Sequence, residues 1–582
     1  MTKKENRALE VAQQEKRLAK SNYGKGEILS GAEILLRAFE IEGVDTIFGY
    51  PGGAVLHIYD ALHNHSSFKH ITPRHEQGGA HAADGYARST GRPGVVIATS
   101  GPGATNLVTG IATAYMDSVP LIVITGQVAV PAVGKDSFQE ADITGITLPI
   151  TKYGYLVKNV DDLARCIHEA FYLATTGRPG PVIIDIPKDI CVAKAEFYYP
   201  PKYNLPGYKF TPNGIEKEVN AALKMLKEAK RPVLYVGGGA IISEAQDLLV
   251  ELAEKLDIPV TTTLMAKGVF PDSHPLALGM AGMHGTAYAN YALCETDLLI
   301  AVGARFSDRV TGNIKTFAKQ AKKIHIDIDA AEINKNIKVD LPIVADISQV
   351  LKALLPKLKK QNRPEWLEQV NKWKEQYPLK YQQEKGKLKP QYVISSINEI
   401  TDDDSIVVAD TGQHQMWAAQ YIKTQRPRKF LTSGGLGTMG YSFPAALGAQ
   451  VANPKKLVVT VVGDGGFQMN CQELATAAVY NLPVKICIIN NGYLGMVRQW
   501  QELFFDKRYS HTCIESCVDF VKLAEAFGVK AIRITKTEEV LPALQEAKNT
   551  PGPVLLDFIV EPEENVFPMV PAGGPINEML GR

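Results

Sequence analysis

Three oxygen donors in the C-terminal third of the sequence could together hold a divalent cation. Asp464 offers a carboxylate, Asn491 offers an amide oxygen, and Tyr493 is expected to offer its backbone carbonyl. Mg²⁺ prefers about six oxygen ligands and usually takes only one or two from side chains, the others coming from phosphate and water. Gly465 and Gly466 would let the backbone approach a phosphate closely, and the following helix N-terminus favours an anion. These residue types predict a Mg²⁺ ion that holds a diphosphate.

Two strands and a helix must position these donors. Residues 457–462 and 484–489 are apolar segments that predict buried strands, and residues 468–481 carry apolar side chains at helical spacing. A strand, a helix and a strand of this size form a crossover with parallel strands, so Asp464 and Asn491 are both expected at the carboxyl ends of neighbouring strands. Open parallel sheets bind ligands at that edge. Taken singly, Asp464 could be an ordinary turn residue and Asn490–Gly492 a tight turn, but the combination favours a cofactor site.

The same alternation of strand-like and helical segments continues along the chain. It predicts an α/β fold of three domains, each built on a parallel sheet flanked by helices. The length of 582 residues fits roughly three or four domains of about 150 residues. Prolines interrupt the pattern at 196–212, and a Lys- and Gln-rich stretch with a solvated helix at 366–373 forms a second joint. The predicted divisions are a flexible segment at 1–25, an N-terminal domain at 26–195, a central domain at 213–356, a linker at 357–390 and a C-terminal domain at 391–582.

Composition argues against several classes of protein. Apolar residues make up 45% and charged residues 21% of the chain, and the net charge is +1, so neither a nucleic-acid nor a membrane partner is indicated. No apolar stretch reaches the roughly 20 residues that span a bilayer. The seven cysteines suit a reducing compartment, and His511, Cys513 and Cys517 lack the fourth ligand of a zinc site. The N-terminus has no features of a secretory signal or transit peptide, which predicts the cytoplasm, or the plastid stroma for an organelle-encoded chain.

The motifs at 463–465 and 490–491 together resemble the diphosphate-binding motif of thiamine-diphosphate enzymes. The resemblance extends from about residue 31 to residue 581, and it is strongest to the large catalytic subunits of the acetohydroxyacid synthase, or acetolactate synthase, family. The family's order of pyrimidine, central and diphosphate domains agrees with the three domains predicted here. The segments that carry the resemblance are Phe48–Gly53, Arg74–Gly78, Gly101–Asn106, Arg305–Gly312, Met496–Trp500 and Pro568–Ala572.

The resemblance implies that thiamine diphosphate, Mg²⁺ and FAD are the cofactors. Glu76, which alone could be an ordinary first-turn helix carboxylate, would bond N1′ of the aminopyrimidine and so promote ionisation of the thiazolium C2. Met439 would bend the cofactor from beneath, although methionine is more often core filler. The glycine-rich turn at 100–106, which could equally be a plain strand-to-helix turn, would shape the pocket. The other residues implied to contact thiamine diphosphate are Gly53, Gly437, Asp464, Gly465, Gly466, Asn491 and Met496.

A site for FAD in the central domain is also implied. Residues 233–239 and 324–329 are strands that end in a glycine turn and in acidic residues, a pattern that suits a nucleotide but also occurs for structural reasons alone. Because the implied reaction needs no electron transfer, the FAD would be structural. The residues implied to hold it are Arg178, Gly238, Gly239, Met283, His284, Gly285, Thr286, Arg305 and Asp327.

The same resemblance implies a pocket for 2-oxoacids. Arg309 would grip a substrate carboxylate, since guanidinium pairs with carboxylate through two hydrogen bonds, whereas a lone arginine is more often a surface residue. Trp500 would form a wall of the acceptor pocket, and Gln139 would help to place the substrate. Pyruvate and 2-oxobutyrate differ by one methylene, which a hydrophobic pocket distinguishes by about 1–3 kcal/mol.

The implied activity is decarboxylation of pyruvate and transfer of the two-carbon unit to a second pyruvate or to 2-oxobutyrate, as at the start of branched-chain amino-acid synthesis. Because Glu76 and Asp464 stand on different predicted domains, the family analogy implies a homodimer or homotetramer, and it adds a small regulatory subunit as a partner. FAD-dependent pyruvate oxidase is the main alternative. A simple 2-oxoacid decarboxylase is disfavoured because no two of the 12 histidines are adjacent. The retained Glu76 argues against a glyoxylate-type carboligase, and intact Asp464 and Asn491 argue against a non-enzymatic scaffold.

Overall fold

The computed structural model describes residues 26–200, 203, 205–208, 215–514 and 518–581. The chain forms two compact units, one built mainly from the residues before Thr211 and one built mainly from those that follow. The predicted flexible segment at 1–25 and part of the predicted joint at 196–212 lie outside the described residues.

The N-terminal unit is built on a six-stranded sheet in which every pairing is parallel. Its strands, in sheet order, are β3 Lys69–Ile71, β2 Thr46–Gly49, β4 Gly94–Ala98, β5 Leu121–Gln127, β7 Val182–Pro187 and β6 Tyr153–Leu156, and a separate antiparallel pair is formed by β1 Ile28–Ser30 and β8 Lys194–Glu196. Its helices are α2 Gly31–Glu42, α3 Leu56–His63, α4 Glu76–Thr90, α5 Pro102–Thr105, α6 Val108–Met116, α7 Ile143–Thr147, α8 Leu163–Thr175 and α9 Lys188–Val192. Val95 and Ile97 share a core with α2 and α8, whereas Val96 lies beside Gly79 of α4 on the opposite face.

The second unit holds two more six-stranded parallel sheets, of which the central one comes first in the chain. Its strands, in sheet order, are β11 Ala277–Met280, β10 Val260–Thr262, β9 Pro232–Val236, β12 Leu298–Val302, β13 Lys322–Asp327 and β14 Leu341–Val344. Its helices are α10 Glu216–Glu228, α11 Gly239–Ile242, α12 Gln246–Leu256, α13 Ala287–Glu295, α14 Asp308–Thr311 and α15 Ile347–Leu354. The order of the strands reverses between β9 and β12, which is where doubly wound sheets bind ligands.

The C-terminal sheet repeats the strand order of the N-terminal one. Its strands, in sheet order, are β16 Phe430–Thr432, β15 Ile406–Ala409, β17 Val458–Gly463, β18 Lys485–Asn490, β20 Val554–Ile559 and β19 Lys530–Ile534. Its helices are α17 Pro390–Ser396, α18 Gln413–Tyr421, α19 Ser442–Ala452, α20 Asp464–Asn470, α21 Leu474–Val479, α22 Gly495–Phe504, α23 Phe520–Ala526 and α24 Thr537–Asn549. In both outer sheets the second strand lies at the edge, followed by the first, third, fourth, sixth and fifth. The three predicted parallel α/β sheets are therefore confirmed.

The predicted elements around the metal motif form with one difference. The segments 457–462 and 484–489 become β17 and β18, which pair in parallel, with Gly463 opposite Ile489. The helix predicted at 468–481 begins earlier, because the chain turns at Gly463 and Asp464 already opens α20. A short 3-10 turn at Cys471–Glu473 then separates α20 from α21.

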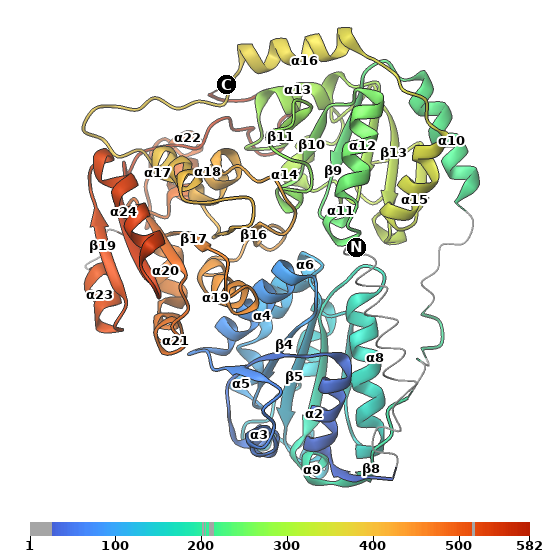
Figure 1. The fold of residues 1–582 in the computed structure, drawn as a ribbon, viewed down its shortest axis with the longest axis vertical. Coiled ribbons are helices and arrows are strands. Elements are labelled where there is room, and N and C mark those ends of the chain that lie inside the picture. The colour runs from blue at the N-terminus through green and yellow to red at the C-terminus, as the bar shows by residue number, and fades with distance from the viewer. Residues whose placement is uncertain (1–25, 201–202, 204, 209–214, 515–517, 582) are drawn as a thin grey trace. The chain divides into compact units, whose positions relative to one another are not determined.

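The helix predicted within the linker is α16 Pro364–Gln376, and it is not solvated all round. Trp366 is 3% exposed and donates its indole N–H to the carbonyl of Pro232 at 3.0 Å. Trp366 and Val370 belong to a core shared with α13, beside which α16 runs in Figure 1. The apolar side of the helix thus packs on the central domain, and only its other side meets solvent. Within the described part of the chain, no helix combines the length and apolar character that a membrane crossing requires.

Candidate active site

The predicted metal donors come together at the carboxyl edge of the C-terminal sheet. Asp464 begins α20 directly after β17, and Asn491 follows β18, the neighbouring parallel strand. The backbone N–H of Gly492 donates to Asp464 Oδ2 at 3.0 Å, which joins the two turns. Tyr493 donates its backbone N–H to Asn491 Oδ1 at 3.1 Å, so the third predicted donor lies next to the second. Strand pairing therefore gathers all three residues at one place.

The carboxyl group of Asp464 is buried at this edge of the sheet. The residue is 3% exposed, and burial raises the pKa of its carboxyl to about 7, with a further contribution from the charge of Asp557. A divalent cation would favour the charged form of this carboxylate. Across the described residues, no three His, Cys, Asp or Glu side chains form a metal cluster, and Cys517 of the weak zinc candidate lies outside that part. One carboxylate with amide and carbonyl oxygens fits Mg²⁺ better than Zn²⁺.

A buried aspartate that the sequence analysis did not single out stands beside these donors. Asp410 follows β15 and accepts hydrogen bonds from the backbone N–H groups of Gly440 at 2.9 Å and Ser442 at 2.8 Å. It thereby fixes the turn that carries Met439. A Cβ on Gly466 would lie 2.9 Å from Asp410 Oδ1, so the turn at 463–466 has no room for a side chain there. The available signal was an aspartate directly after an apolar strand, the same pattern as in the metal motif.

Two polar residues of α18 were also missed. His414 accepts the Gly463 N–H at Nε2, at 3.2 Å, and burial lowers its pKa to about 3, so the imidazole is neutral. Gln413 accepts a hydrogen bond from Asn491 Nδ2 at 3.3 Å and donates to the Gln499 side chain at 2.9 Å. Gln413 therefore sets the rotation of the Asn491 amide, on which the direction of the amide oxygen depends.

Met439, which the resemblance assigns to the bend of the cofactor, lies beside the turn at 463–466. Its Cε is 3.7 Å from the position that a Cβ on Gly465 would occupy. Leu494 Cδ2 and Ile514 Cδ1 each lie 3.0 Å from the same position, so apolar side chains surround this glycine. Gly437, two residues before Met439, has a φ of +71°, a conformation that favours glycine.

The predicted catalytic carboxylate lies in the N-terminal unit. Glu76 is the half-buried first residue of α4, and its Oε2 accepts a hydrogen bond from Asn106 Nδ2 at 3.0 Å. His75 caps the helix, its Nδ1 accepting a backbone N–H of the first turn at 3.0 Å. A Cβ on Gly103 would lie 3.3 Å from Glu76 Oε1, so the turn at 100–106 forms one wall around the carboxylate. Asp464 belongs to the other unit, and each half of the predicted site has its own local geometry.

Two further predicted contacts lie near this turn. A Cβ on Gly101 would be 2.8 Å from the carbonyl oxygen of Gln139, which places the Gln139 backbone against the turn. Gly53 belongs to the loop after β2, and the next residue, Ala54, donates its N–H to Thr99 Oγ1 at 3.1 Å. Thr99 directly follows β4, on the other side of the strand reversal between β2 and β4. Glu76, Gly53 and Gln139 thus gather at the ligand-binding edge of the N-terminal sheet.

The central sheet places three predicted nucleotide contacts at its reversal point. Gly238 and Gly239 follow β9, and Arg305 stands in the turn after β12. A Cβ on Gly237 would lie 2.1 Å from the carbonyl oxygen of Gly303, so the two turns meet backbone to backbone. A sheet of this strand order accommodates a dinucleotide in the crevice between such turns.

The segment Met283–Thr286 is held between the central domain and the C-terminal segment. The N–H of Met283 donates to the carbonyl of Arg309 at 2.8 Å, and Thr286 caps α13. His284 is buried, with Nδ1 3.3 Å from the carbonyl oxygen of Pro568. Burial lowers the pKa of His284 to about 4, so its ring is neutral. The implied nucleotide contacts of this segment therefore include one side chain that is directed toward Pro568.

The remaining two nucleotide candidates stand in different units. Asp327 ends β13, is 8% exposed, and its Oδ1 accepts the Asp329 N–H at 2.9 Å. Arg178 belongs to the N-terminal unit, where its Nε donates to Ser118 Oγ at 2.9 Å. Only Asp327 therefore shares a sheet with Gly238.

Arg309 and Trp500 lie beside each other. The guanidinium carbon of Arg309 is 5.9 Å from the centre of the Trp500 ring, a cation–π distance. Arg309 Nη1 also lies 3.4 Å from Met283 Sδ. Met496 stands one turn before Trp500 on α22 and packs against the C-terminal core. The tertiary structure thus places Arg309, predicted to bind a substrate carboxylate, beside Trp500, predicted to form a wall of the acceptor pocket.

Comparison with known families gives three matches along the chain. The models of the thiamine pyrophosphate enzymes match with the N-terminal TPP binding domain at residues 29–146, the central domain at 219–354 and the C-terminal TPP binding domain at 410–558. The last match includes Asp410 and every residue of the metal motif.

Curated proteins from distant organisms are similar to nearly the whole chain. The acetolactate synthase large subunit of Corynebacterium glutamicum is 52% identical over 558 residues, which covers 94% of this chain and 89% of the relative. The acetolactate synthase large subunit of Pyropia yezoensis is 50% identical over 564 residues, or 95% of each chain. A probable acetolactate synthase large subunit of Methanocaldococcus jannaschii is 50% identical over 565 residues, again 95% of each.

Proposed function

The chain belongs to the acetolactate synthase family of thiamine pyrophosphate enzymes, and from that premise we propose that it decarboxylates pyruvate and joins the remaining two-carbon unit to a second 2-oxoacid. Two pyruvates give 2-acetolactate and CO₂, and 2-oxobutyrate as acceptor gives 2-aceto-2-hydroxybutyrate. The observation that supports this most is the meeting of Asp464 and Asn491 at the ends of adjacent parallel strands, inside the segment that matches the TPP binding domain.

Mg²⁺ is assigned to Asp464, Asn491 and the backbone carbonyl of Tyr493. The pairing of residues 492–494 with 512–514 fixes that carbonyl in place, since Leu494 donates to Thr512 at 2.8 Å. The diphosphate would lie at the N-terminus of α20, where the glycines permit close approach and the helix dipole favours an anion. Thiamine diphosphate, when bound, supplies a thiazolium ring that can accept the electrons left by loss of CO₂.

Glu76 is assigned the proton at N1′ of the aminopyrimidine. Asn106 donates a hydrogen bond to Glu76 Oε2, and Oε1 is assigned to share that proton. Such general acid–base help is typically worth about 10²–10⁴-fold in rate. Met439 is assigned to the bend between the two rings of thiamine diphosphate, because its side chain lies beside Gly465.

Substrate recognition is assigned to Arg309, Trp500 and Gln139. Arg309 carries the positive charge that a 2-oxoacid carboxylate requires, and Trp500 presents an apolar ring beside it. An apolar wall favours the acceptor with the extra methylene, because burying that group is favourable whereas it adds no polar group to desolvate. Gln139 is assigned to help place the substrate, because its backbone lies against the turn that borders Glu76.

FAD is assigned a structural role at the reversal point of the central sheet. The close-packed turns after β9 and β12 lie at the carboxyl edge of the sheet, where a doubly wound sheet accommodates a dinucleotide. Gly238, Gly239, Arg305 and Asp327 are the candidates from that sheet, with the segment Met283–Thr286 beside them. The net reaction moves no electrons between substrate and flavin, so the flavin would stabilise the fold.

The assembled enzyme is proposed to be a homodimer or a larger homo-oligomer that also binds a small regulatory subunit. The two carboxylates with assigned roles, Glu76 and Asp464, stand in different units of the chain. Bringing them to one cofactor between two subunits would complete the site. The products would feed the synthesis of branched-chain amino acids.

One assay tests the central proposal. Purified protein is given thiamine diphosphate, Mg²⁺, FAD and pyruvate, and the product is identified by mass while oxygen uptake is recorded. We expect 2-acetolactate and CO₂ without oxygen consumption. Acetyl products with oxygen uptake would identify a pyruvate oxidase instead, and acetaldehyde alone would identify a simple decarboxylase.

A further inference from the structure

A buried carboxyl group in the N-terminal unit has no role in the chemistry proposed above. Asp185, on β7, is 1% exposed. Its Oδ1 accepts the Thr125 hydroxyl at 2.7 Å, and its Oδ2 accepts the side-chain amide of Gln127 at 2.9 Å. Both donors lie on β5, which pairs with β7 in parallel. Burying a carboxyl group costs free energy, which these hydrogen bonds must offset.

Gln127 connects this carboxyl group to a surface loop. Its Nε2 also donates to the backbone carbonyl of Ala141 at 2.9 Å, and its Oε1 accepts the N–H of Val128 at 2.9 Å. One glutamine side chain therefore holds both ends of the loop at 128–141. Asp185 takes the remaining N–H of that amide and so fixes its rotation. With Gln127 only 3% exposed, bulk water scarcely competes for these hydrogen bonds.

The loop presents Gln139 in a left-handed backbone conformation. Its φ is +59°, a region that residues other than glycine rarely adopt and keep only when their surroundings enforce it. The carbonyl oxygen of Gln139 lies 2.8 Å from where a Cβ on Gly101 would stand. Gly101 opens the turn whose Asn106 donates to Glu76. The end of the loop that Gln127 holds through the carbonyl of Ala141 is thus the end that lies against the turn beside Glu76.

We propose that Asp185 is a positioning residue: by orienting Gln127 it fixes the loop at 128–141 and holds Gln139 where the 2-oxoacid substrate binds. This inference rests on the acetolactate synthase activity proposed above and on the assignment of Gln139 to the substrate pocket. Asp185 itself contacts neither substrate nor cofactor. Its removal frees the amide of Gln127 to rotate and releases the carbonyl of Ala141, two residues after Gln139.

Other contacts keep the loop folded when Asp185 is removed, so the expected change is a displacement. Glu140 accepts the Ser137 N–H at 2.9 Å within the loop, and Asp189 accepts the Val130 N–H at 3.1 Å near its start. A small displacement of a substrate-positioning group can be costly, since about 1 Å can change catalytic efficiency by up to about 10²-fold. The chemical steps at Glu76 should be affected less than substrate affinity.

Asparagine is the conservative replacement for Asp185. Burial raises the pKa of this carboxyl to about 7, and the nearby charge of Asp142 adds to the shift, so the neutral acid is well populated near neutral pH. An asparagine amide keeps the shape of that acid, can accept from Gln127 and can donate to Thr125 Oγ1. Asp185→Asn should therefore preserve the loop, whereas Asp185→Ala should not.

The test compares steady-state kinetics of the complete holoenzyme for several variants. We expect the KM for pyruvate to rise about tenfold in Asp185→Ala and in Gln127→Leu, with kcat within about twofold of wild type, and Asp185→Asn to remain near wild type. Asp185→Ala combined with Gln139→Ala should be no worse than Gln139→Ala alone, because both changes act through one side chain. Glu42→Ala removes another largely buried carboxylate of the same unit and should lower stability without changing KM.

Amide hydrogen exchange supplies a readout that does not depend on activity. Exchange should accelerate within residues 128–141 in Asp185→Ala and Gln127→Leu, and stay unchanged in the turn at 100–106. Additive KM effects in the double variant, or an unchanged loop, would overturn the positioning role. Failure of the wild-type protein to form acetolactate would instead overturn the proposed function, so the two failures can be told apart.

Discussion

The two carboxylates with proposed roles, Asp464 and Glu76, have different surroundings. Asp464 is buried, and burial raises its pKa, a shift that a cation bound there would oppose by favouring the charged form. Glu76 is half-buried and directed by Asn106, which leaves it accessible for proton exchange with a bound ring. These differences are compatible with the separate roles proposed for the two carboxylates.

The role of Glu76 is tested by the isosteric change Glu76→Gln. The amide has the same size as the carboxylate but cannot share the proton at N1′, so acetolactate formation should fall by about 10²–10⁴-fold. Folding and affinity for Mg²⁺ and thiamine diphosphate should stay near wild type, as measured by calorimetry of the purified variant. Turnover close to wild type would refute the assigned role.

The acceptor pocket is tested by Trp500→Leu. Loss of the ring should reduce discrimination between pyruvate and 2-oxobutyrate by about 1–3 kcal/mol, because an apolar pocket recognises one methylene with that energy. The measurement is the ratio of the two products when both acceptors compete, with total decarboxylation as the control. An unchanged product ratio would show that Trp500 does not contribute to the acceptor pocket.

Asp185 predicts a specific dependence of stability on pH. Its folded-state pKa of about 7 lies above the ordinary 3.8, so the folded protein binds this proton more tightly than the unfolded chain does. The stabilisation is therefore full below about pH 4 and is lost as the pH rises through about 7. Relative to Asp185→Asn, which cannot titrate, wild type should gain about 2 kcal/mol between pH 7.5 and pH 5.5. Urea unfolding at both pH values measures this difference, and parallel curves for the two proteins would contradict it.

At the scale of elements, each sheet places at least one candidate residue beside the point where the strand order reverses: Gly53 follows β2, Gly238 follows β9 and Asp464 follows β17. In the outer sheets these points lie between β2 and β4 and between β15 and β17, and in the central sheet between β9 and β12. Connections leave the two neighbouring strands in opposite directions there, which opens a crevice at the carboxyl edge. The turns that border such a crevice must be narrow, which explains why glycines are concentrated at these strand ends.

Gly237→Ala tests this requirement in the central sheet. A Cβ there would lie 2.1 Å from the carbonyl oxygen of Gly303, so the two turns must separate, at a cost of about 1–3 kcal/mol. The purified variant should lose its flavin absorbance and unfold at a lower temperature. Gly238→Ala is the comparison for stability, because its Cβ would meet only Met265 at 3.3 Å, so this variant should unfold at a temperature closer to wild type. Equal losses of thermal stability in both variants would contradict the need for a narrow turn at Gly237.

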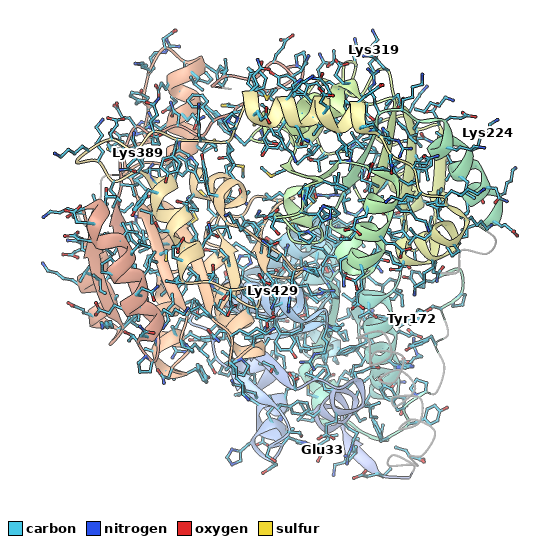
Figure 2. The ribbon with its side chains drawn as sticks, turned by 45° about the horizontal axis from the view of Figure 1, so that its top comes forward. Glu33, Tyr172, Lys224, Lys319, Lys389 and Lys429 are labelled. Atoms are coloured by element: carbon cyan, nitrogen blue, oxygen red, sulfur yellow. The ribbon has the colours of Figure 1, made fainter. Side chains whose placement is uncertain are left out.

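At the scale of the whole molecule, the chain after β20 ties the C-terminal sheet to the central one. Lys389, labelled in Figure 2, donates to Glu564 Oε2 at 2.6 Å, and the backbone carbonyl of Glu564 accepts from Gln413 at 2.9 Å. Further along, the N–H of Val570 donates to the carbonyl of Met283 at 2.8 Å. One segment therefore supports both the residue that orients Asn491 and the segment implied to hold FAD.

Lys389→Met tests this connection. It leaves the partly buried Glu564 without its lysine partner, which should lower the free energy of unfolding by about 1–3 kcal/mol and weaken Mg²⁺ binding through Gln413. Lys387→Met is the matched control, since the ion pairs of Lys387 with Glu384 and Glu561 are largely exposed to solvent and contribute little to stability. Denaturant unfolding and Mg²⁺ titration measure both effects. Equal losses in the two variants would show that the segment has no such role.

The local sequence pattern was sufficient to predict the strands and the residues at their carboxyl ends. A strand buried on both faces of a parallel sheet is a continuous apolar segment, and a polar residue directly after it must lie at the carboxyl edge. Asp464 and Asn491 could therefore be placed from the sequence, as could the glycine turn at Gly238. An apolar strand also precedes Asp410, but no second polar residue of a recognisable motif accompanies it, so the sequence pattern did not mark Asp410 as a functional residue.

The tertiary structure decided what depends on contacts between distant parts of the chain. His414 meets Gly463, Asp185 meets Gln127, and Glu564 meets Lys389 only because strands and helices far apart in sequence pack together. No local pattern encodes such pairs, because each partner alone is compatible with many surroundings. The matching strand order of the outer sheets is hidden for a related reason: parallel sheets require only buried apolar strands, so one topology can be built from unrelated residues. The sequence by itself thus determined which residues reach the sheet edges, and only packing decided which of them meet there.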